Sequence, residues 1–184
     1  MSGNTVLAMR AVQEAIGGDL RSAHDFFHEN LFDPLNMQGA LLEPDQAGTF
    51  LGCSHMLATA RDWARFGQLY VDGGRAGDRR LIPEDWIQYV TTPTPESLAA
   101  RRGDVFWEPR RSAYGAGFWL FAGVEEASAS SLPRDAFDAN GIQGQYVHII
   151  PSKKLVVVRL GATNYRGDDY ERLPREVIEA MRRD

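Results

Sequence analysis

The hydrophobic pattern of the chain changes its period at about residue 112. Before that point apolar residues recur at helical spacing, as in the run from Val6 to Ile16. After it they alternate or run together in short segments, and Leu155–Leu160 contains three consecutive valines, which predicts a strand covered on both faces. The sequence therefore predicts an α+β fold. A mainly helical part at 1–111 would precede an antiparallel sheet and a closing C-terminal helix at 112–184, all in one domain.

Turn residues and helix caps give the expected boundaries of the elements. The first helix should end at Gly17-Gly18, and the helix that ends near Val71 should begin at Thr59, with Asp62 completing its cap. Further helices are predicted at about Leu20–Asn30, after Pro83 and at about Leu173–Met181. Strands are predicted at Tyr114–Phe121, Ala136–Asn140, Gln145–Ile150 and Leu155–Leu160. Residues 91–111 and 124–134 are predicted to be irregular connections.

Composition excludes several classes of function. Hydrophobic residues make up 43% and charged residues 24%, as in globular proteins, and the net charge is −5. Because phosphate binding needs a concentrated basic surface, nucleic acid is not expected as a partner. No apolar run approaches the ~20 residues needed to span a membrane, and no signal peptide follows Met1. The sequence leaves the cellular compartment open.

The sequence also contains no recognisable metal-binding or cofactor-binding motif. His24 and His28 lie four residues apart and could share one helix face. A glutamate of the His-Glu-x-x-His kind does not accompany them, so we interpret both as surface or packing residues and expect no metal and no cofactor. Cys53 is the only cysteine and cannot form an internal disulfide.

One segment between two predicted strands has chemical interest. In Gly141-Ile142-Gln143-Gly144, two glycines flank a short turn. A hairpin corner or bulge explains this pattern by itself. Alternatively, Gly141 lets a ligand approach the backbone, and the Ile142 N–H points at a developing oxyanion. One such donor is typically worth on the order of 3 kcal/mol of transition-state stabilisation.

Four stretches together resemble a known family. They are Leu31–Met37, Ala58–Gly67, Tyr114–Trp119 and Gly141–Gln145. Their order and spacing are similar to the C-terminal part of the serine β-lactamase-like hydrolases, a group that includes class C β-lactamases, DD-peptidases, esterases and 6-aminohexanoate-oligomer hydrolases. The resemblance implies an incomplete β-lactamase-like fold. It also implies acyl transfer through a serine nucleophile, a lysine base and a tyrosine proton relay.

The resemblance assigns catalytic positions residue by residue. Ile142 matches the backbone oxyanion donor and Gly141 the glycine before it. Ser2 matches the third residue of a Tyr-x-Ser motif, although a simple helix cap explains Ser2 equally well. The Ser-x-x-Lys motif of the family does not occur in the 184 residues.

A second departure from the family concerns the substrate. Where β-lactamases and DD-peptidases have Lys-Thr-Gly, this chain has Ala139-Asn140-Gly141, without the cation that attracts a substrate carboxylate. The resemblance therefore implies a small neutral ester or linear amide as substrate. Candidate substrate-binding residues are Asn140, Gln143, Tyr114 and Trp119, with core packing as the alternative for the two aromatic residues.

Two interpretations of function remain open at this point. In the first, the chain is the C-terminal portion of a serine hydrolase, is inactive alone, and needs the N-terminal half of the same fold as its partner. In the second, it is a non-catalytic module that binds a ligand or a partner chain. An in-frame Tyr-x before Ser2 in the coding DNA, with Ser-x-x-Lys further upstream, would favour the first.

Overall fold

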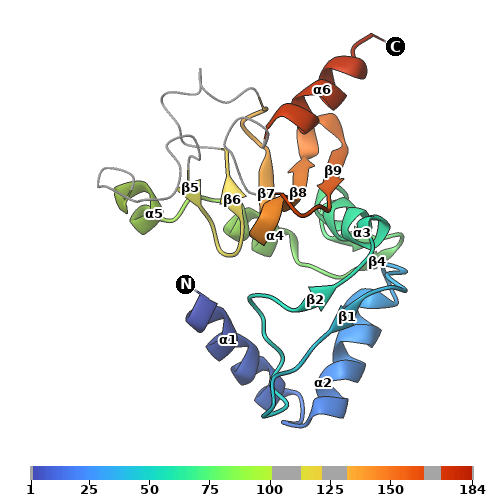
Figure 1. Ribbon diagram of the computed structural model, residues 1–184, viewed down its shortest axis with the longest axis vertical. Helices are drawn as coiled ribbons and strands as arrows, with labels where there is room; N and C mark the ends of the chain where they lie inside the picture. The colour runs from blue at the N-terminus through green and yellow to red at the C-terminus, as the bar shows by residue number, and fades with distance from the viewer. Residues whose placement is uncertain (1, 101–112, 122–131, 164–170, 184) are drawn as a thin grey trace. The chain divides into compact units, whose positions relative to one another are not determined.

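The computed structural model describes residues 2–100, 113–121, 132–163 and 171–183 (Figure 1). Its internal contacts separate the chain into two compact units, Met1–Phe66 and Gly67–Asp184. None of the helices in these described ranges is both long and apolar enough to cross a membrane. The α+β order predicted from the change of period is confirmed, because helices precede a five-stranded antiparallel sheet and a C-terminal helix follows it.

The first unit is mainly helical. Its elements are α1 (Ser2–Ala15), α2 (Leu20–Phe27), the π-helical turn η1 (His28–Phe32), the paired strands β1 (Leu41–Leu42) and β2 (Met56–Leu57), and the first part of α3 (Ala60–Val71). Phe32, Met37 and Ala40 are buried at its centre, with partly buried apolar side chains around them. The predicted helix Leu20–Asn30 is thus confirmed as α2 and most of η1.

Helix α1 forms where it was predicted and ends before Gly17-Gly18, but the one buried side chain among its described residues is polar. Val12 is 42% exposed, whereas Gln13 is 2% exposed and contacts the segment 48–50. The Gln13 amide donates to the Gly48 carbonyl (2.8 Å) and its oxygen accepts from the Phe50 N–H (3.4 Å). A polar side chain can therefore make the buried contact of a helix when both its donor and its acceptor are hydrogen-bonded, even though hydrophobic periodicity predicts apolar residues at that contact.

The cap predicted for α3 is confirmed. Asp62 Oδ2 accepts bonds from the Thr59 hydroxyl (2.6 Å) and the Thr59 N–H (3.1 Å), and the Asp62 N–H donates to Thr59 Oγ1 (3.2 Å). These reciprocal bonds satisfy backbone donors that the first turn of a helix leaves unpaired. They explain why Asp62 is buried although it is charged.

The second unit is built on the sheet. Its elements are the end of α3, β3 (Arg75–Ala76), β4 (Arg79–Arg80), α4 (Glu84–Val90), α5 (Pro95–Ala100), β5 (Ala113–Tyr114), β6 (Trp119–Leu120), β7 (Phe137–Gly141), η2 (Ile142–Gly144), β8 (Gln145–Ile150), η3 (Pro151–Lys153), β9 (Leu155–Arg159) and α6 (Arg172–Ala180). The strands β5 to β9 lie side by side in chain order, and every neighbouring pair is antiparallel.

Two sequence predictions for this unit were wrong in detail. The single strand expected over Tyr114–Phe121 is a tight hairpin, β5–β6, in which the Gly115 N–H donates to the Phe118 carbonyl (2.9 Å) and Gly117 has φ +112°. Periodicity cannot separate one strand from two short ones when the glycines that permit the turn lie inside the run. The 91–111 connection contains α5, while 101–111 and 124–131 lie outside the described residues.

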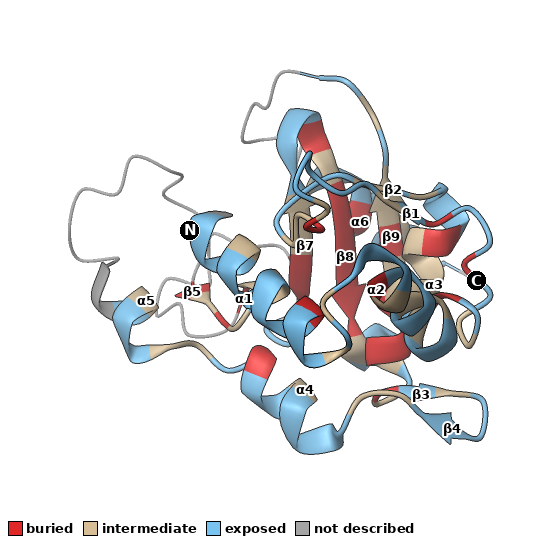
Figure 2. Ribbon diagram, turned by 90° about the horizontal axis from the view of Figure 1, so that it is seen from below, coloured by how far each residue is buried: buried red, intermediate tan, exposed pale blue. Residues whose placement is uncertain are grey.

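Both faces of the sheet are covered within this unit. On one face, Ile178 of α6 packs with Phe121, Tyr146 and Ile150. On the other, Tyr70 at the end of α3 contacts the rings of Phe118 and Phe137, with centroids 4.9 and 5.9 Å apart. Burial there raises the pKa of Tyr70 to about 12. Figure 2 shows the consequence, because β8 between the two layers is buried along nearly its whole length.

Candidate functional site

The predicted oxyanion donor, Ile142, follows the part of β7 that is not paired with β6. Strand β7 pairs with β8 along its whole length, from Phe137↔Ile149 to Gly141↔Gln145. On the opposite side, β6 pairs with it at Phe137 and Asp138. In the described ranges no strand pairs with 139–141 on that side, so among those residues this part of β7 is an edge of the sheet.

Ile142 follows directly after this open edge. Its side chain is 86% exposed. Within the residues that the structure describes, no hydrogen bond uses the Ile142 N–H as its donor. The preceding Gly141 is extended, with φ −119° and ψ 170°. A backbone N–H that makes no bond within the sheet and adjoins a strand edge can serve as an oxyanion donor.

The backbone of the following turn adopts an uncommon conformation. Gln143 has φ +61° and ψ 26°, and Gly144 has φ +77°, so two successive residues are left-handed. A side chain other than glycine typically costs about 1–2 kcal/mol in this region. The conformation at Gln143 therefore needs support from its surroundings.

That support comes from residues 159–163, which we call the β9 extension. Arg159 donates to the Gly144 carbonyl (2.6 Å) and to Thr163 Oγ1 (2.8 Å), and the Thr163 N–H donates to the Gln143 carbonyl (3.1 Å). Gly144 suits this position because of its positive φ, and a Cβ there would lie 2.5 Å from Arg159 Nη1 and so would displace the Arg159 guanidinium. The β9 extension thus fixes the turn through bonds to Gln143 and Gly144, while Ile142 stays exposed.

Of the two glutamines near the turn, one has a structural role. The Gln145 amide donates to the Gly161 carbonyl and its oxygen accepts from the Gly161 N–H (3.0 Å), so both ends of the side chain are occupied by the β9 extension. Gln143, the predicted substrate-binding residue, is exposed at the tip of the turn. Its assignment stays a prediction.

The other predicted substrate-binding residues share one face of the sheet. Tyr114 lies opposite Trp119 and Trp119 opposite Asp138, and Asn140 follows on the same face of β7. The Tyr114 and Trp119 rings pack edge to face, 5.0 Å apart, and both are half-buried. Burial raises the pKa of Tyr114. The structure therefore shows the packing role of these aromatics, and their contact with a substrate stays a prediction.

Ser2 and the lysines belong to other elements than this group. Ser2 is the first residue of α1 in the other compact unit. Lys153 and Lys154 lie between β8 and β9, at the opposite end of β8 from Ile142. At 3.3 Å per residue, β8 separates them from the turn by roughly 17 Å. Neither lysine can act as a base at the Ile142 amide.

Sequence reasoning missed a buried polar pair beside the edge. Asp138 and His148 are cross-strand partners, each 0% exposed, with His148 Nδ1 3.5 Å from Asp138 Oδ2. The His148 ring also contacts that of Tyr146, with centroids 4.5 Å apart. The sequence signal was the position of both residues on the buried face of two neighbouring strands, where a polar side chain needs a hydrogen-bonding partner.

Two cavities formed by described residues of this unit lie elsewhere. One of about 490 Å³ is lined by residues of α4 and the segment before it, including Trp86 and Tyr89, and one of about 440 Å³ lies along the end of α6. Neither includes a residue of the β7–β8 hairpin. In the described part of the chain, the candidate site is thus an open edge of the sheet.

The comparisons with known proteins agree with this architecture. Residues 3–182 match the sequence model of the family described as Beta-lactamase. A 6-aminohexanoate-dimer hydrolase of Paenarthrobacter ureafaciens is 28% identical over 123 residues, which are 67% of this chain and 29% of that protein.

Two solved structures show the same fold at low identity. A β-lactamase from Mycobacterium bovis superposes with a TM-score of 0.70 at 16% identity, over 98% of this chain and 62% of its own. Simvastatin synthase (LovD) from Aspergillus terreus does so with a TM-score of 0.63 at 15% identity, over 96% of this chain and 52% of its own. The chain thus spans less than two thirds of each of these relatives. Because the family model matches from residue 3 to residue 182, the chain belongs to the β-lactamase family of serine hydrolases.

Proposed function

We propose that this chain supplies the oxyanion-hole strand and one wall of the cleft in a serine hydrolase that cleaves esters or amides through an acyl-enzyme. The observation that carries the proposal is the Ile142 N–H. Ile142 is 86% exposed, follows Gly141 at the edge of β7, and belongs to a turn that the bonds from the β9 extension hold in place.

The chemistry follows from the position of this amide. A serine hydroxyl attacks the substrate carbonyl, and negative charge moves onto the carbonyl oxygen as the tetrahedral intermediate forms. A backbone N–H that is fixed beforehand stabilises this charge without reorganisation during the reaction. Arg159 contributes indirectly, because its bond to the Gly144 carbonyl fixes the turn that carries the donor.

We infer that the substrate is a neutral ester or a linear amide. Ala139 stands where the lysine of Lys-Thr-Gly would lie, so the edge offers no cation to a substrate carboxylate. The likeness to a 6-aminohexanoate-dimer hydrolase supports an amide substrate, since that protein's name describes a linear amide. In this proposal the nucleophile and its base come from a Ser-x-x-Lys segment outside residues 1–184.

A serine-reactive fluorophosphonate probe tests this function. The native protein that contains this chain together with a Ser-x-x-Lys segment is expected to be labelled on that serine, with one label per chain and competition by a neutral ester. The isolated 184-residue chain is expected to remain unlabelled, because its lysines lie far from the edge of β7. Labelling is read by in-gel fluorescence and by mass spectrometry of the modified peptide, with heat-denatured protein as the control.

Two results would reject the proposal. Stoichiometric labelling of the isolated chain would place the nucleophile within residues 1–184. Absence of labelling in the longer protein, with retained ligand or partner binding, would instead support a non-catalytic module built on the same fold.

A further inference from the structure

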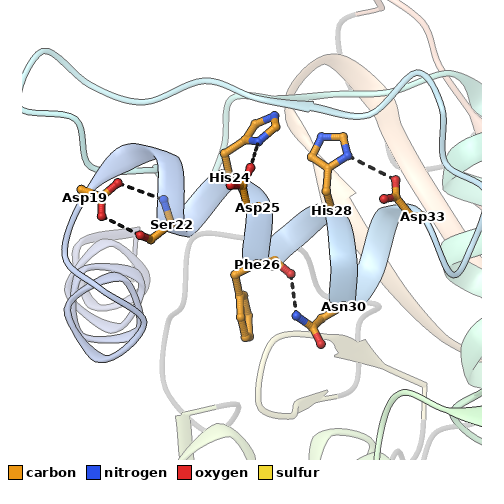
Figure 3. A network of polar contacts seen from close by, with 8 residues as sticks. All are labelled: Asp19, Ser22, His24, Asp25, Phe26, His28, Asn30 and Asp33. Atoms are coloured by element: carbon orange, nitrogen blue, oxygen red, sulfur yellow. Dashed lines mark hydrogen bonds and ion pairs between the residues drawn. The ribbon is translucent and has the colours of Figure 1, made fainter.

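Two histidines lie side by side on the surface of the first unit (Figure 3). His24 is in the last turn of α2, and His28 opens the π-helical turn η1 that continues it. A spacing of four residues puts both side chains on one helix face. Their ring centroids are 4.4 Å apart and the ring planes differ by 31°. The side chains are 55% and 36% exposed, so both rings are accessible from solvent.

Each ring is held by a carboxylate through the same nitrogen. His24 Nδ1 lies 3.0 Å from Asp25 Oδ1, and His28 Nδ1 lies 3.3 Å from Asp33 Oδ1. A carboxylate only accepts hydrogen bonds, so each contact places the proton on Nδ1. The neutral tautomer then carries its lone pair on Nε2. This is how histidine ligands of metals are usually oriented, with one nitrogen bonded to a carboxylate and the other to the metal.

The local backbone fixes this arrangement. In η1 the Asp33 N–H donates to the His28 carbonyl five residues earlier (2.9 Å), which brings Asp33 round to the His28 ring. Such π-helical turns occur frequently at functional sites. Phe32, which is 2% exposed, packs edge-on against the His28 ring at 5.3 Å and limits its rotation.

We propose that Nε2 of His24 and Nε2 of His28 together bind one divalent transition-metal ion, with water completing the coordination. Imidazole nitrogens suit Zn²⁺, Ni²⁺ and Cu²⁺ and not Mg²⁺ or Ca²⁺. Asp25 and Asp33 offset part of the charge of the ion while they orient the ligands. Among the described residues no cluster of three or more candidate ligands occurs. The site is therefore one with two protein ligands, and it does not depend on the proposed hydrolase function.

The test is Zn²⁺ binding by isothermal titration calorimetry, on the full chain without a histidine tag in a non-coordinating buffer at pH 7.5. One ion is expected per chain. His24→Ala and His28→Ala are each expected to weaken binding at least about tenfold, and Asp33→Asn by about tenfold, the lower limit for carboxylates that orient metal ligands. Cu²⁺ is expected to bind more tightly than Zn²⁺ or Ni²⁺.

His55→Ala is the matched control. His55 is an exposed histidine bonded through Nδ1 to the Ser54 hydroxyl (2.6 Å), without a second histidine beside it. Its removal should leave Zn²⁺ affinity unchanged. All these positions are exposed or partly exposed, and circular dichroism would verify that each variant folds. Unchanged affinity in either His24→Ala or His28→Ala would overturn the two-ligand site, as would loss of binding in His55→Ala.

Discussion

Replacing Ile142 with proline in the complete hydrolase should lower kcat by about 10²- to 10³-fold, the loss typical when one oxyanion donor is removed. Proline deletes the N–H and leaves the nucleophile in place. The backbone accepts this change, because Gly141 is extended with ψ 170° and residue 142 begins a short helical turn, where proline is tolerated. Steady-state hydrolysis of a neutral ester, measured beside the unfolding midpoint, gives the result.

Ile142→Val is the control for this substitution. Because the Ile142 side chain is 86% exposed, valine keeps the amide and removes little packing, so kcat should remain within about twofold of the parent enzyme. If the proline variant hydrolyses the ester at the parent rate, residue 142 has no role as oxyanion donor.

A second large effect is expected on stability. Gly74→Ala should lower the free energy of unfolding by roughly 3–5 kcal/mol, from steric overlap together with an unfavourable left-handed conformation. A Cβ at Gly74 would lie 2.2 Å from the Ile82 carbonyl oxygen, and Gly74 has φ +84°. The contact cannot be relieved cheaply, because the Gly74 carbonyl accepts from the N–H groups of Leu81 (2.8 Å) and Ile82 (3.1 Å).

Gly77→Ala separates the two contributions. Gly77 also has a positive φ, +57°, but a Cβ there would meet nothing within 4 Å. This variant should lose only the conformational part, about 1–2 kcal/mol. Urea unfolding of both variants gives the difference. Equal losses would contradict the close approach of Gly74 to the 81–82 backbone.

Much of the fold follows from local signals in the sequence. The cap at Thr59 and Asp62 and the hairpin over 141–145 could be predicted because each is specified by residues a few positions apart. Periodicity gave the order of helices and strands for the same reason. The burial of Gln13 on α1 could not be predicted, because its partners at Gly48 and Phe50 are more than 30 residues away.

The candidate site was only partly predictable. The turn around Ile142 has a local glycine signature, but its support by Arg159 and Thr163 joins residues 15 or more positions apart and has no local pattern. The histidine pair shows the same limit. Spacing placed His24 and His28 on one face, whereas the π-helical turn that brings Asp33 to His28 has no pattern in the sequence by which it could be predicted.

The chemical shift of one amide proton tests the central claim most directly. After the nucleophilic serine of the complete hydrolase has been phosphonylated, a phosphonyl oxygen should occupy the oxyanion position. The Ile142 amide proton should then move downfield in the ¹H–¹⁵N spectrum by more than the amide protons of Gly141 and Gln143. An Ile142 amide that keeps its position while the serine is fully modified would show that this strand edge does not contact the reacting carbonyl.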